Sequence, residues 1–394
     1  MNTIKELIKK YCPDGVEYKK LGEIGFFYSG LSGKSKDDFK DGNAMFITYM
    51  NVYSNPSTNL DVIERVKIGQ GEKQNKIEKG DILFTGSSET PDECGMSSVV
   101  TDDITSNYYL NSFCFGFRLN NKDTFEPNFL KHLFRDRKMR AQIARTANGV
   151  TRYNVSKKLF ARIIIPVPPL PVQREIVRIL DNFTSLEAEL EAELEARRKQ
   201  YEYYRDQLLS FKHLSGGGKN EVEWKTLGEV ATKISSGRNK EKLSEGIFPV
   251  YGSTGIIAYS NSYQFDRELI LVARVGANAG FVNIANGKYD VSDNTLIIEP
   301  NEDTSLKYLF YVLQNMNINK FAKGGGQPLI TASLIKKLRI PLPPLSTQRR
   351  IVSILDRFES LVNDITTGLP AEIAARRQQY EYYRDQLLSF KRKS

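Results

Sequence analysis

The sequence predicts an α+β protein with an internal repeat, in which two mixed α/β domains are separated by two long helices that pair as an antiparallel coiled coil. Three observations predict this fold. One long segment occurs twice, helical periodicity continues through both copies, and the stretches before the copies carry strand patterns and share little sequence. A chain of 394 residues is also long enough for two domains that each bury a core.

The repeat has three parts, and each part appears once in each half of the chain. The paired segments are EYKKLGEI (17–24) with EWKTLGEV (223–230), IPVPPLPVQREIVRILDNFTSL (165–186) with IPLPPLSTQRRIVSILDRFESL (340–361), and RKQYEYYRDQLLSFK (198–212) with RQQYEYYRDQLLSFK (377–391). The expected divisions are an N-terminal segment (1–17), a first variable domain (18–164), a first connector helix (165–213), a linker (214–223), a second variable domain (224–339) and a second connector helix (340–394).

The variable domains are rich in strand patterns. Apolar or alternating runs broken by glycine and asparagine predict strands in AMFITYMNV (44–52), GDILFTG (80–86), LNSFCFGFRL (110–119), ELILVARVG (268–276) and NTLIIEP (294–300). Each domain then ends in a helical stretch, at 125–145 and at 305–321. We therefore expect two mixed α/β domains.

The first connector begins with a proline-rich approach and continues as a helix. Proline disfavours a helix interior, so the helix should start just after the last proline, near Val172 or Gln173, and run to about Phe211. Roughly forty residues give a length of about 60 Å. Steps of three and four between apolar residues predict a coiled-coil seam. Its members are Ile176, Leu180, Phe183, Leu190, Leu194, Tyr201, Tyr204, Leu208 and Phe211.

The second connector repeats this seam with one irregularity. Ile365, Leu369 and Ile373 are separated by two consecutive steps of four, which predicts a stutter that accommodates the extra turn of this copy. Gly368 and Pro370 lie there, so we expect a kink or a helix restart.

Two such helices bury their seams against each other or against partners, and antiparallel pairing is the economical solution. It would place the two variable domains at opposite ends of a rod, related by an approximate two-fold axis. SGGGKN (215–220) would then be the flexible linker into the second half.

The net charge and the hydropathy of the sequence indicate the kind of partner and the cellular location of the protein. The formal net charge of +9 favours a polyanionic partner such as nucleic acid. The sequence has no apolar run long enough to span a bilayer, and its first fifteen residues have no apolar core that could serve as a signal peptide. These features predict a cytoplasmic protein.

The sequence offers little for catalysis or metal binding. His132 and His213 are the two histidines, and we expect a helix residue and a solvated helix end. SGKS (32–35) lacks the first glycine of a phosphate-binding loop, and no glycine-rich loop follows a strand as S-adenosylmethionine binding would require. Three widely spaced cysteines are expected to be reduced thiols in or near cores, namely Cys12, Cys94 and Cys114. We predict no catalytic and no metal site.

Several loops combine basic, small polar and aromatic residues that suit DNA. Lysine and arginine neutralise phosphates, while arginine, asparagine, glutamine and serine read base edges in the major groove. Comparable loops recur in both domains. The candidate DNA-binding residues are Lys34, Lys36, Ser87, Asn148, Arg152, Tyr153, Arg238, Lys240, Tyr251, Ser253, Arg274 and Gln327.

At the repeated IPxPPL, QRxIVxILD and RxQYEYYRDQLLSF motifs the chain resembles the specificity subunit of type I restriction-modification systems, and the resemblance covers the whole chain. It implies a subunit without a catalytic site, in which each recognition domain reads one half of a split DNA target. It also implies two modification subunits that methylate adenine, and restriction subunits that translocate and cleave DNA. S-adenosylmethionine, ATP and Mg²⁺ would then be bound by those partners and not by this chain.

The repeated tyrosine segments are predicted to contact the modification subunits, because aromatic and arginine side chains are typical interface anchors. The candidate partner-binding residues are Tyr203, Arg205, Gln207, Tyr382, Arg384 and Gln386. Within the first connector, LEAELEAELEAR (186–197) consists of three near-identical tetrads of good helix formers. We expect these tetrads to set the gap between the two half-sites.

Two other classes of protein fit parts of the sequence. A stand-alone DNA methyltransferase would need the missing cofactor motifs and would bind S-adenosylmethionine by itself. A coiled-coil scaffold for ligands other than DNA would give no salt-dependent gel shift in the presence of the modification subunit.

Overall fold

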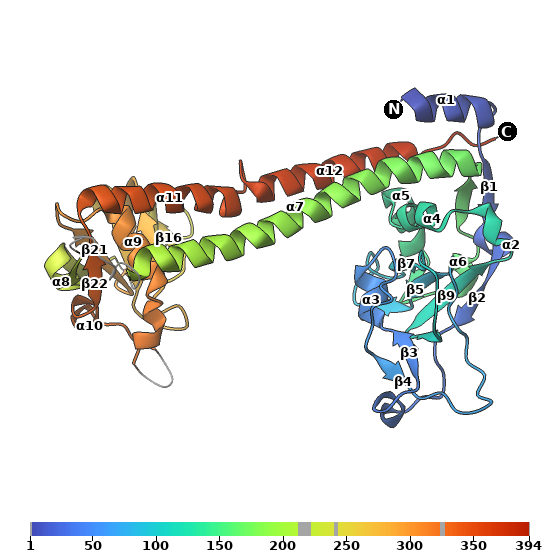
Figure 1. Cartoon of the computed structure of the whole chain (residues 1–394), viewed down its shortest axis with the longest axis horizontal. Coiled ribbons are helices and arrows are strands. Elements are labelled where there is room, and N and C mark those ends of the chain that lie inside the picture. Colours follow the sequence, from blue (N-terminus) through green and yellow to red (C-terminus); the bar gives the residue numbers. More distant parts are fainter. Residues whose placement is uncertain (1, 212–221, 240–242, 324–327, 394) are drawn as a thin grey trace, which may run out of the picture. The chain divides into compact units, whose positions relative to one another are not determined.

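The computed structural model describes residues 2–211, 222–239, 243–323 and 328–393. The chain divides into two compact units, Met1–Glu189 with Ile373–Ser394, and Leu190–Glu372. Each unit contains one α/β domain and one pair of connector segments (Figure 1). The predicted linker SGGGKN and His213 lie outside the described residues.

The first domain is built on a four-stranded antiparallel sheet. The runs ILFT and CFGFRL form its central strands, and they are apolar almost throughout because both of their faces are covered. In sheet order the strands are β2 (Gly25–Ser29), β9 (Cys114–Leu119), β5 (Ile82–Thr85) and β7 (Ser97–Val99).

Three smaller sheets complete the first domain. Their strands are β1 (Glu17–Lys20) with β12 (Ile164–Val167), β4 (Arg65–Val66) with β3 (Ala44–Ile47) and β8 (Tyr108–Leu110), and β10 (Ala147–Asn148) with β11 (Tyr153–Val155) and β6 (Ser87–Ser88). The β3–β8 pairing is parallel, and the other pairings are antiparallel. The β1–β12 pair joins the start of the domain to the residues that lead into the first connector.

The first unit also contains several short helices. They are α1 (Asn2–Tyr11), α2 (Leu21–Ile24), the 3-10 helix η1 (Lys36–Phe39), α3 (Tyr49–Ser54), the 3-10 helix η2 (Lys122–Thr124), α4 (Pro127–Leu133), α5 (Arg137–Ala144) and α6 (Lys157–Phe160). The predicted helical stretch 125–145 therefore consists of two helices. Asp136 separates them, because its carboxylate accepts hydrogen bonds from the backbone N–H groups of Lys138 and Met139 and caps α5.

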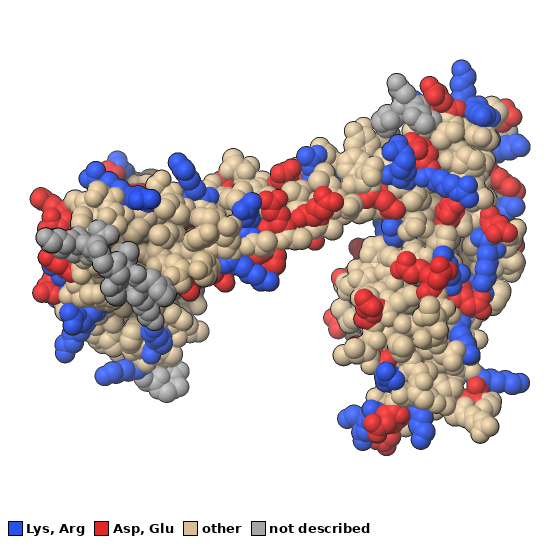
Figure 2. All heavy atoms as spheres, viewed as in Figure 1, with Lys and Arg blue, Asp and Glu red and all other residues tan. Residues whose placement is uncertain are grey.

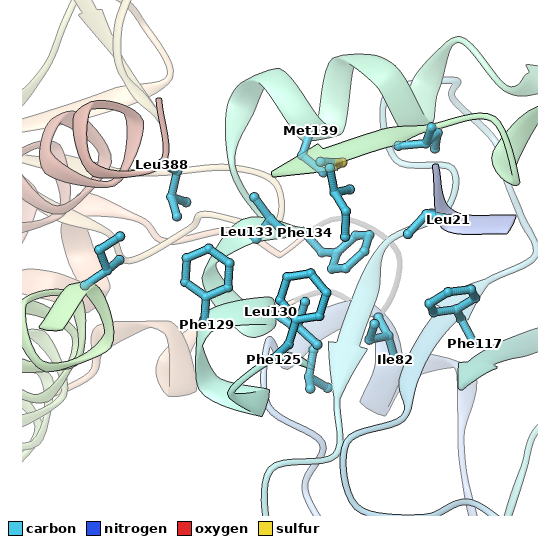
Figure 3. Close-up of a cluster of buried hydrophobic side chains, with 14 of the residues drawn as sticks. Leu21, Ile82, Phe117, Phe125, Phe129, Leu130, Leu133, Phe134, Met139 and Leu388 are labelled. Carbon is cyan, nitrogen blue, oxygen red and sulfur yellow. The ribbon is translucent and has the colours of Figure 1, made fainter. Parts of the chain in front are cut away.

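The core of the first unit lies between this sheet, helices α4 and α5, and the connector. Figure 3 shows side chains from each of these parts turned toward one another. The labelled residues are Leu21, Ile82, Phe117, Phe125, Phe129, Leu130, Leu133, Phe134, Met139 and Leu388. Leu388 belongs to the C-terminal connector segment, which is therefore part of the first unit's core.

The second domain repeats this arrangement with an unrelated sequence. Its strands are β14 (Ala231–Ser236), β21 (Thr295–Pro300), β18 (Leu269–Ala273) and β19 (Val282–Ala285) in one sheet, β16 (Gly255–Ser260), β15 (Phe248–Gly252), β20 (Lys288–Val291) and β17 (Phe265–Asp266) in another, and β13 (Glu223–Thr226) with β22 (Arg339–Leu342). Its helices are α8 (Leu227–Val230), α9 (Leu306–Asn315), η3 (Ile318–Phe321) and α10 (Ala332–Lys336). The parallel β15–β20 pair corresponds to β3–β8, and β13–β22 corresponds to β1–β12.

A fully buried glutamine in each repeat attaches the domain to its connector. Gln173 accepts a hydrogen bond from Glu126 N–H at 2.9 Å and donates to the carbonyls of Thr124 and Pro168 at 3.0 and 2.7 Å. Gln348 makes the same three contacts with Ser305, Asp303 and Pro343 in the second unit. The repeated glutamine thus attaches the N-terminal end of α4 or α9 to the start of the connector in the same unit.

The first connector is the single helix α7 (Leu170–Ser210). It starts slightly earlier than predicted, because proline is tolerated in the first turn of a helix, where its missing N–H has no intrahelical partner to lose, and Pro171 occupies that turn. Within the first unit, Phe183 stacks on Tyr383 at 5.2 Å and Glu187 pairs with Arg377. Later residues of α7 therefore face earlier residues of the partner helix, which is antiparallel pairing.

The second connector consists of two helices, α11 (Leu345–Asn363) and α12 (Leu369–Leu387), as the predicted restart requires. Between them, the carboxylate of Asp364 accepts hydrogen bonds from the backbone and hydroxyl groups of Thr366 and Thr367. The predicted seam position of Ile365 is wrong: this residue lies in the break and is 81% exposed, because a residue between two helices follows neither helix's apolar stripe.

In the second unit, α7 packs on α11 through aromatic residues. Tyr201 and Tyr204 lie against Phe358 at ring-centre distances of 6.4 and 5.7 Å. The two halves of α7 therefore bury their seams against different helices of the second connector.

Candidate nucleic-acid interface

A pocket of about 530 Å³ lies in the first domain, where β6 and the loop between β10 and β11 meet helix α3. It combines aromatic, apolar and charged side chains in one place. Its lining residues are Tyr49, Met50, Tyr53, Ser87, Ser88, Glu89, Glu93, Phe113, Thr151 and Arg152. The sequence prediction included Ser87 and Arg152 and missed the others, because it looked for cations, amides and serines in loops.

Arg152 is held at the edge of this pocket by a buried serine. Its Nε and Nη2 atoms both donate to Ser87 Oγ, at 3.1 and 3.0 Å, and its guanidinium lies 5.7 Å from the ring centre of Phe113. Ser87 is paired in β6 with Asn154 of β11, so the two strands place the serine and the arginine side by side. The arginine is thus oriented before any ligand arrives.

Two stacked tyrosines form a second part of the pocket. Tyr49 donates from its hydroxyl to the carbonyl of Ser87 at 2.7 Å, and its ring stacks on Tyr53 at 6.1 Å. Tyr53 donates to Glu93 at 2.8 Å. Hydrogen bonds from Tyr53 and Thr90 hold the pKa of Glu93 below its usual value, so this carboxylate stays ionised.

The second domain places a different arginine at the corresponding point of its fold. The equivalence follows from backbone hydrogen bonds. In the first domain, Gly86 N–H donates to the carbonyl of Phe113, and the carbonyl of Gly86 accepts from Val155 N–H. In the second domain, Arg274 N–H donates to the carbonyl of Asn294, and the carbonyl of Arg274 accepts from Ile330 N–H. The matched pairs are therefore Gly86 with Arg274, Phe113 with Asn294, and Val155 with Ile330.

Arg274, like Arg152, is oriented by a serine. Its Nη1 atom donates to Ser236 Oγ at 3.2 Å and to the carbonyl of Asp293 at 3.1 Å. Its Nε atom is buried without a hydrogen-bond partner in the described part of the chain. Each domain therefore presents a serine-supported arginine at the same end of its main sheet, supplied from positions that do not align in sequence.

The other predicted DNA-binding residues have varied surroundings. Lys34 is largely buried and bonds Glu72 and the carbonyl of Lys67, and the hydrogen bond from Lys34 lowers the pKa of Glu72 to about 2. Lys36 is exposed in η1. In the loop pair beside the pocket, Asn148 is exposed and Tyr153 is half-buried.

In the second domain, Arg238 is exposed two residues after the end of β14, and Tyr251 and Ser253 are half-buried at the end of β15. Tyr251 packs against the ring of Tyr289 at 5.4 Å. Lys240 and Gln327 lie outside the described residues. Figure 2 shows lysine and arginine interspersed with aspartate and glutamate on the visible face, without one continuous basic surface.

Each domain also contacts the repeated aspartate of the ILD motif in its own connector. His132 of α4 bonds Asp181 through Nε2 at 2.8 Å and Tyr380 through Nδ1 at 2.9 Å. Tyr311 of α9 bonds the corresponding Asp356 at 2.6 Å. Burial lowers the pKa of His132, and the hydrogen bond to Asp181 opposes part of this shift.

The repeated tyrosine segments present matching surfaces in the two units. Tyr203 and Tyr382 are each 61% exposed, and each makes an edge contact with the following tyrosine. Gln207 and Gln386 are also exposed. The two arginines lean back onto the helix, because Arg205 lies over Tyr201 and Arg384 lies over Tyr380.

The described residues contain no helix that is both long and apolar enough to cross a membrane. Within the same residues, no group of three or more histidine, cysteine, aspartate or glutamate side chains is arranged to hold a metal ion. The three cysteines are free and buried, as the sequence predicted.

Two segments of the chain, 13–196 and 219–375, match the family model described as the type I restriction modification DNA specificity domain. The chain belongs to this family. Type I specificity domains thus occur twice in it, and each match combines a variable domain with a connector segment. The repeat that was evident in the sequence is the repeat of this domain.

Several specificity subunits are similar in sequence. The Escherichia coli EcoR124I/EcoR124II specificity subunit is 38% identical over 60% of this chain, and a putative Haemophilus influenzae specificity subunit is 33% identical over 69%. These matches span 64% and 74% of the relatives' own lengths, so the E. coli match covers less than two thirds of that protein.

Solved structures of specificity subunits share the fold. A type I restriction-modification S subunit from M. genitalium gives a TM-score of 0.55 at 17% identity, covering 95% of this chain and 96% of that one. A chain from a structural study of type I R-M complex assembly gives a TM-score of 0.64 at 19% identity, covering 95% and 98%.

Proposed function

We propose that this chain is the DNA sequence-specificity subunit of a type I restriction-modification complex, with each domain binding one half of a bipartite double-stranded DNA target. The observation that carries the proposal is the duplication of the specificity domain, with a serine-supported arginine at the same end of the main sheet in each copy. Arginine is the side chain that most often reads guanine in the major groove. We also propose that the loops with the predicted DNA-binding residues contact the DNA.

The connector helices would dock two modification subunits, one in each unit. Nearly identical tyrosine segments with equal exposure of Tyr203 and Tyr382 support two equivalent docking surfaces. Aromatic side chains that are already exposed and ordered on a helix are suitable anchors for a partner. The length of the helices between the domains would set the gap between the half-sites.

The chain would contribute recognition and assembly, and no catalytic step. S-adenosylmethionine would be bound by the modification subunits, and ATP and Mg²⁺ by restriction subunits. The whole complex would act in the cytoplasm, where the DNA is.

The test exchanges residues 18–164 for the corresponding domain of a relative in a complete modification enzyme, followed by sequencing of methylated sites. One half of the methylated motif should change, and the other half should stay as it was. Exchange of residues 224–339 is the matched control and should change the opposite half. A motif in which both halves change after either exchange would refute modular recognition.

A further inference from the structure

The pocket of the first domain leaves one particular edge of Arg152 open. A guanidinium has five N–H donors, and Ser87 Oγ receives those of Nε and one of Nη2. The end edge, where one N–H of Nη1 and one of Nη2 point in parallel, has no protein partner in the described residues. Two parallel donors match the O6 and N7 acceptors of guanine in the major groove.

Glu89 provides an acceptor in the same pocket. It is exposed and has no hydrogen bond or ion pair within the described residues, whereas Glu93 is occupied by Tyr53, Thr90 and Ser88. An ionised carboxylate can accept a hydrogen bond from the amino group of cytosine N4 or adenine N6. A base edge therefore offers partners to both free groups of the pocket.

The charge of the pocket argues against a phosphate ligand. Glu89 and Glu93 outnumber the single cation Arg152 among the lining residues. Carboxylates repel phosphate oxygens, and sites for the DNA backbone are instead rich in lysine and arginine. The charged residues of the pocket therefore suit a base edge and not a phosphate group of the DNA backbone.

We infer that Arg152 specifies a guanine, and Glu89 a base with an exocyclic amino group, in the half-site bound by the first domain. The inference rests on the proposed function and assigns bases to this one pocket. Ser87 is the positioning residue for Arg152, since it holds the Nε and Nη2 edge of the guanidinium, which adjoins the reading edge.

The experiment uses the complete modification enzyme carrying Arg152→Ala, Arg152→Lys or Glu89→Gln in the specificity subunit, and reads the methylated motif by genome sequencing. One good bidentate contact gives about 1–3 kcal/mol of discrimination, roughly 5- to 150-fold. Arg152→Ala should lose about that much preference for guanine at one position of one half-site. Arg152→Lys should lose less, because a lysine ammonium can also donate to guanine O6 and N7 but lacks the fixed fork of the guanidinium.

Glu89→Gln should relax a different position of the same half-site, because an amide presents donors as well as an acceptor. Arg145→Ala is the matched control. Arg145 is an exposed arginine of the same domain that does not line the pocket, so its removal should leave the motif unchanged.

Three results would overturn the inference. An unchanged motif in active Arg152→Ala enzyme would show that this side chain does not read a base. Equal weakening on all DNA sequences, with a shallower dependence on salt, would make Arg152 a phosphate contact. Loss of a modification subunit from the Arg152→Lys complex in native mass spectrometry would make the pocket a protein interface. None of these results alters the outcome of the domain exchange, so the proposed function is tested separately.

Discussion

Replacing Gln173 by alanine should loosen the first domain from its connector. The side chain is fully buried and makes three hydrogen bonds, to Glu126 N–H and to the carbonyls of Thr124 and Pro168. A hydrogen bond contributes about 1 kcal/mol net, so three give about 3 kcal/mol before any cost of leaving the partners unpaired. This corresponds to roughly a 150-fold increase in the opening equilibrium.

Hydrogen exchange followed by mass spectrometry measures this effect locally. Peptides that cover α4 should exchange faster in the variant, while peptides that cover α9 in the second unit should not change. Gln348→Ala should give the reverse pattern, since it makes the same contacts in the second unit. Gln207→Ala is the control, because Gln207 is an exposed glutamine of α7.

The result that would refute the reasoning is specific. If Gln173→Ala reduced the opening free energy of α4 by less than about 1 kcal/mol, the three bonds would not act as the attachment. Equal loosening of α4 and α9 would also contradict it, because the contacts of Gln173 all lie within the first unit.

Three further predictions concern the connectors. Tyr203→Ala or Tyr382→Ala should lower the number of bound modification subunits from two towards one in native mass spectrometry, and an unchanged mass would contradict the docking surface. Deleting 187–190 removes one tetrad, about 6 Å of helix, and should shorten the gap in the methylated motif by one or two base pairs at about 3.4 Å each, with both half-sites kept. Burial lowers the pKa of His132, so the unfolded state binds its proton more readily. The first domain should therefore lose stability as the pH falls from its unfolded pKa of about 6.5 toward the lower folded value. His132→Gln should flatten this pH dependence in urea unfolding curves recorded between those values.

The sequence by itself determined the repeat, the helical connectors and the restart in the second of them. These features depend on local rules: apolar residues at steps of three and four form one face of a helix, proline limits where a helix begins, and glycine with proline ends it. The strand runs ILFT and LILVA were predictable for the same reason, since a short apolar run between turns is typical of a buried strand.

Only the tertiary structure decided which residues share a site. Arg152 meets Ser87 because β11 pairs with β6, and 65 residues separate the two in sequence. Arg274 takes the equivalent place from the end of β18, at a position where the first domain has Gly86. No alignment of the two halves relates these arginines, because strand pairing brings them to the same place along different paths. The sequence states which residues prefer helix or strand, whereas long-range backbone hydrogen bonds determine which side chains become neighbours.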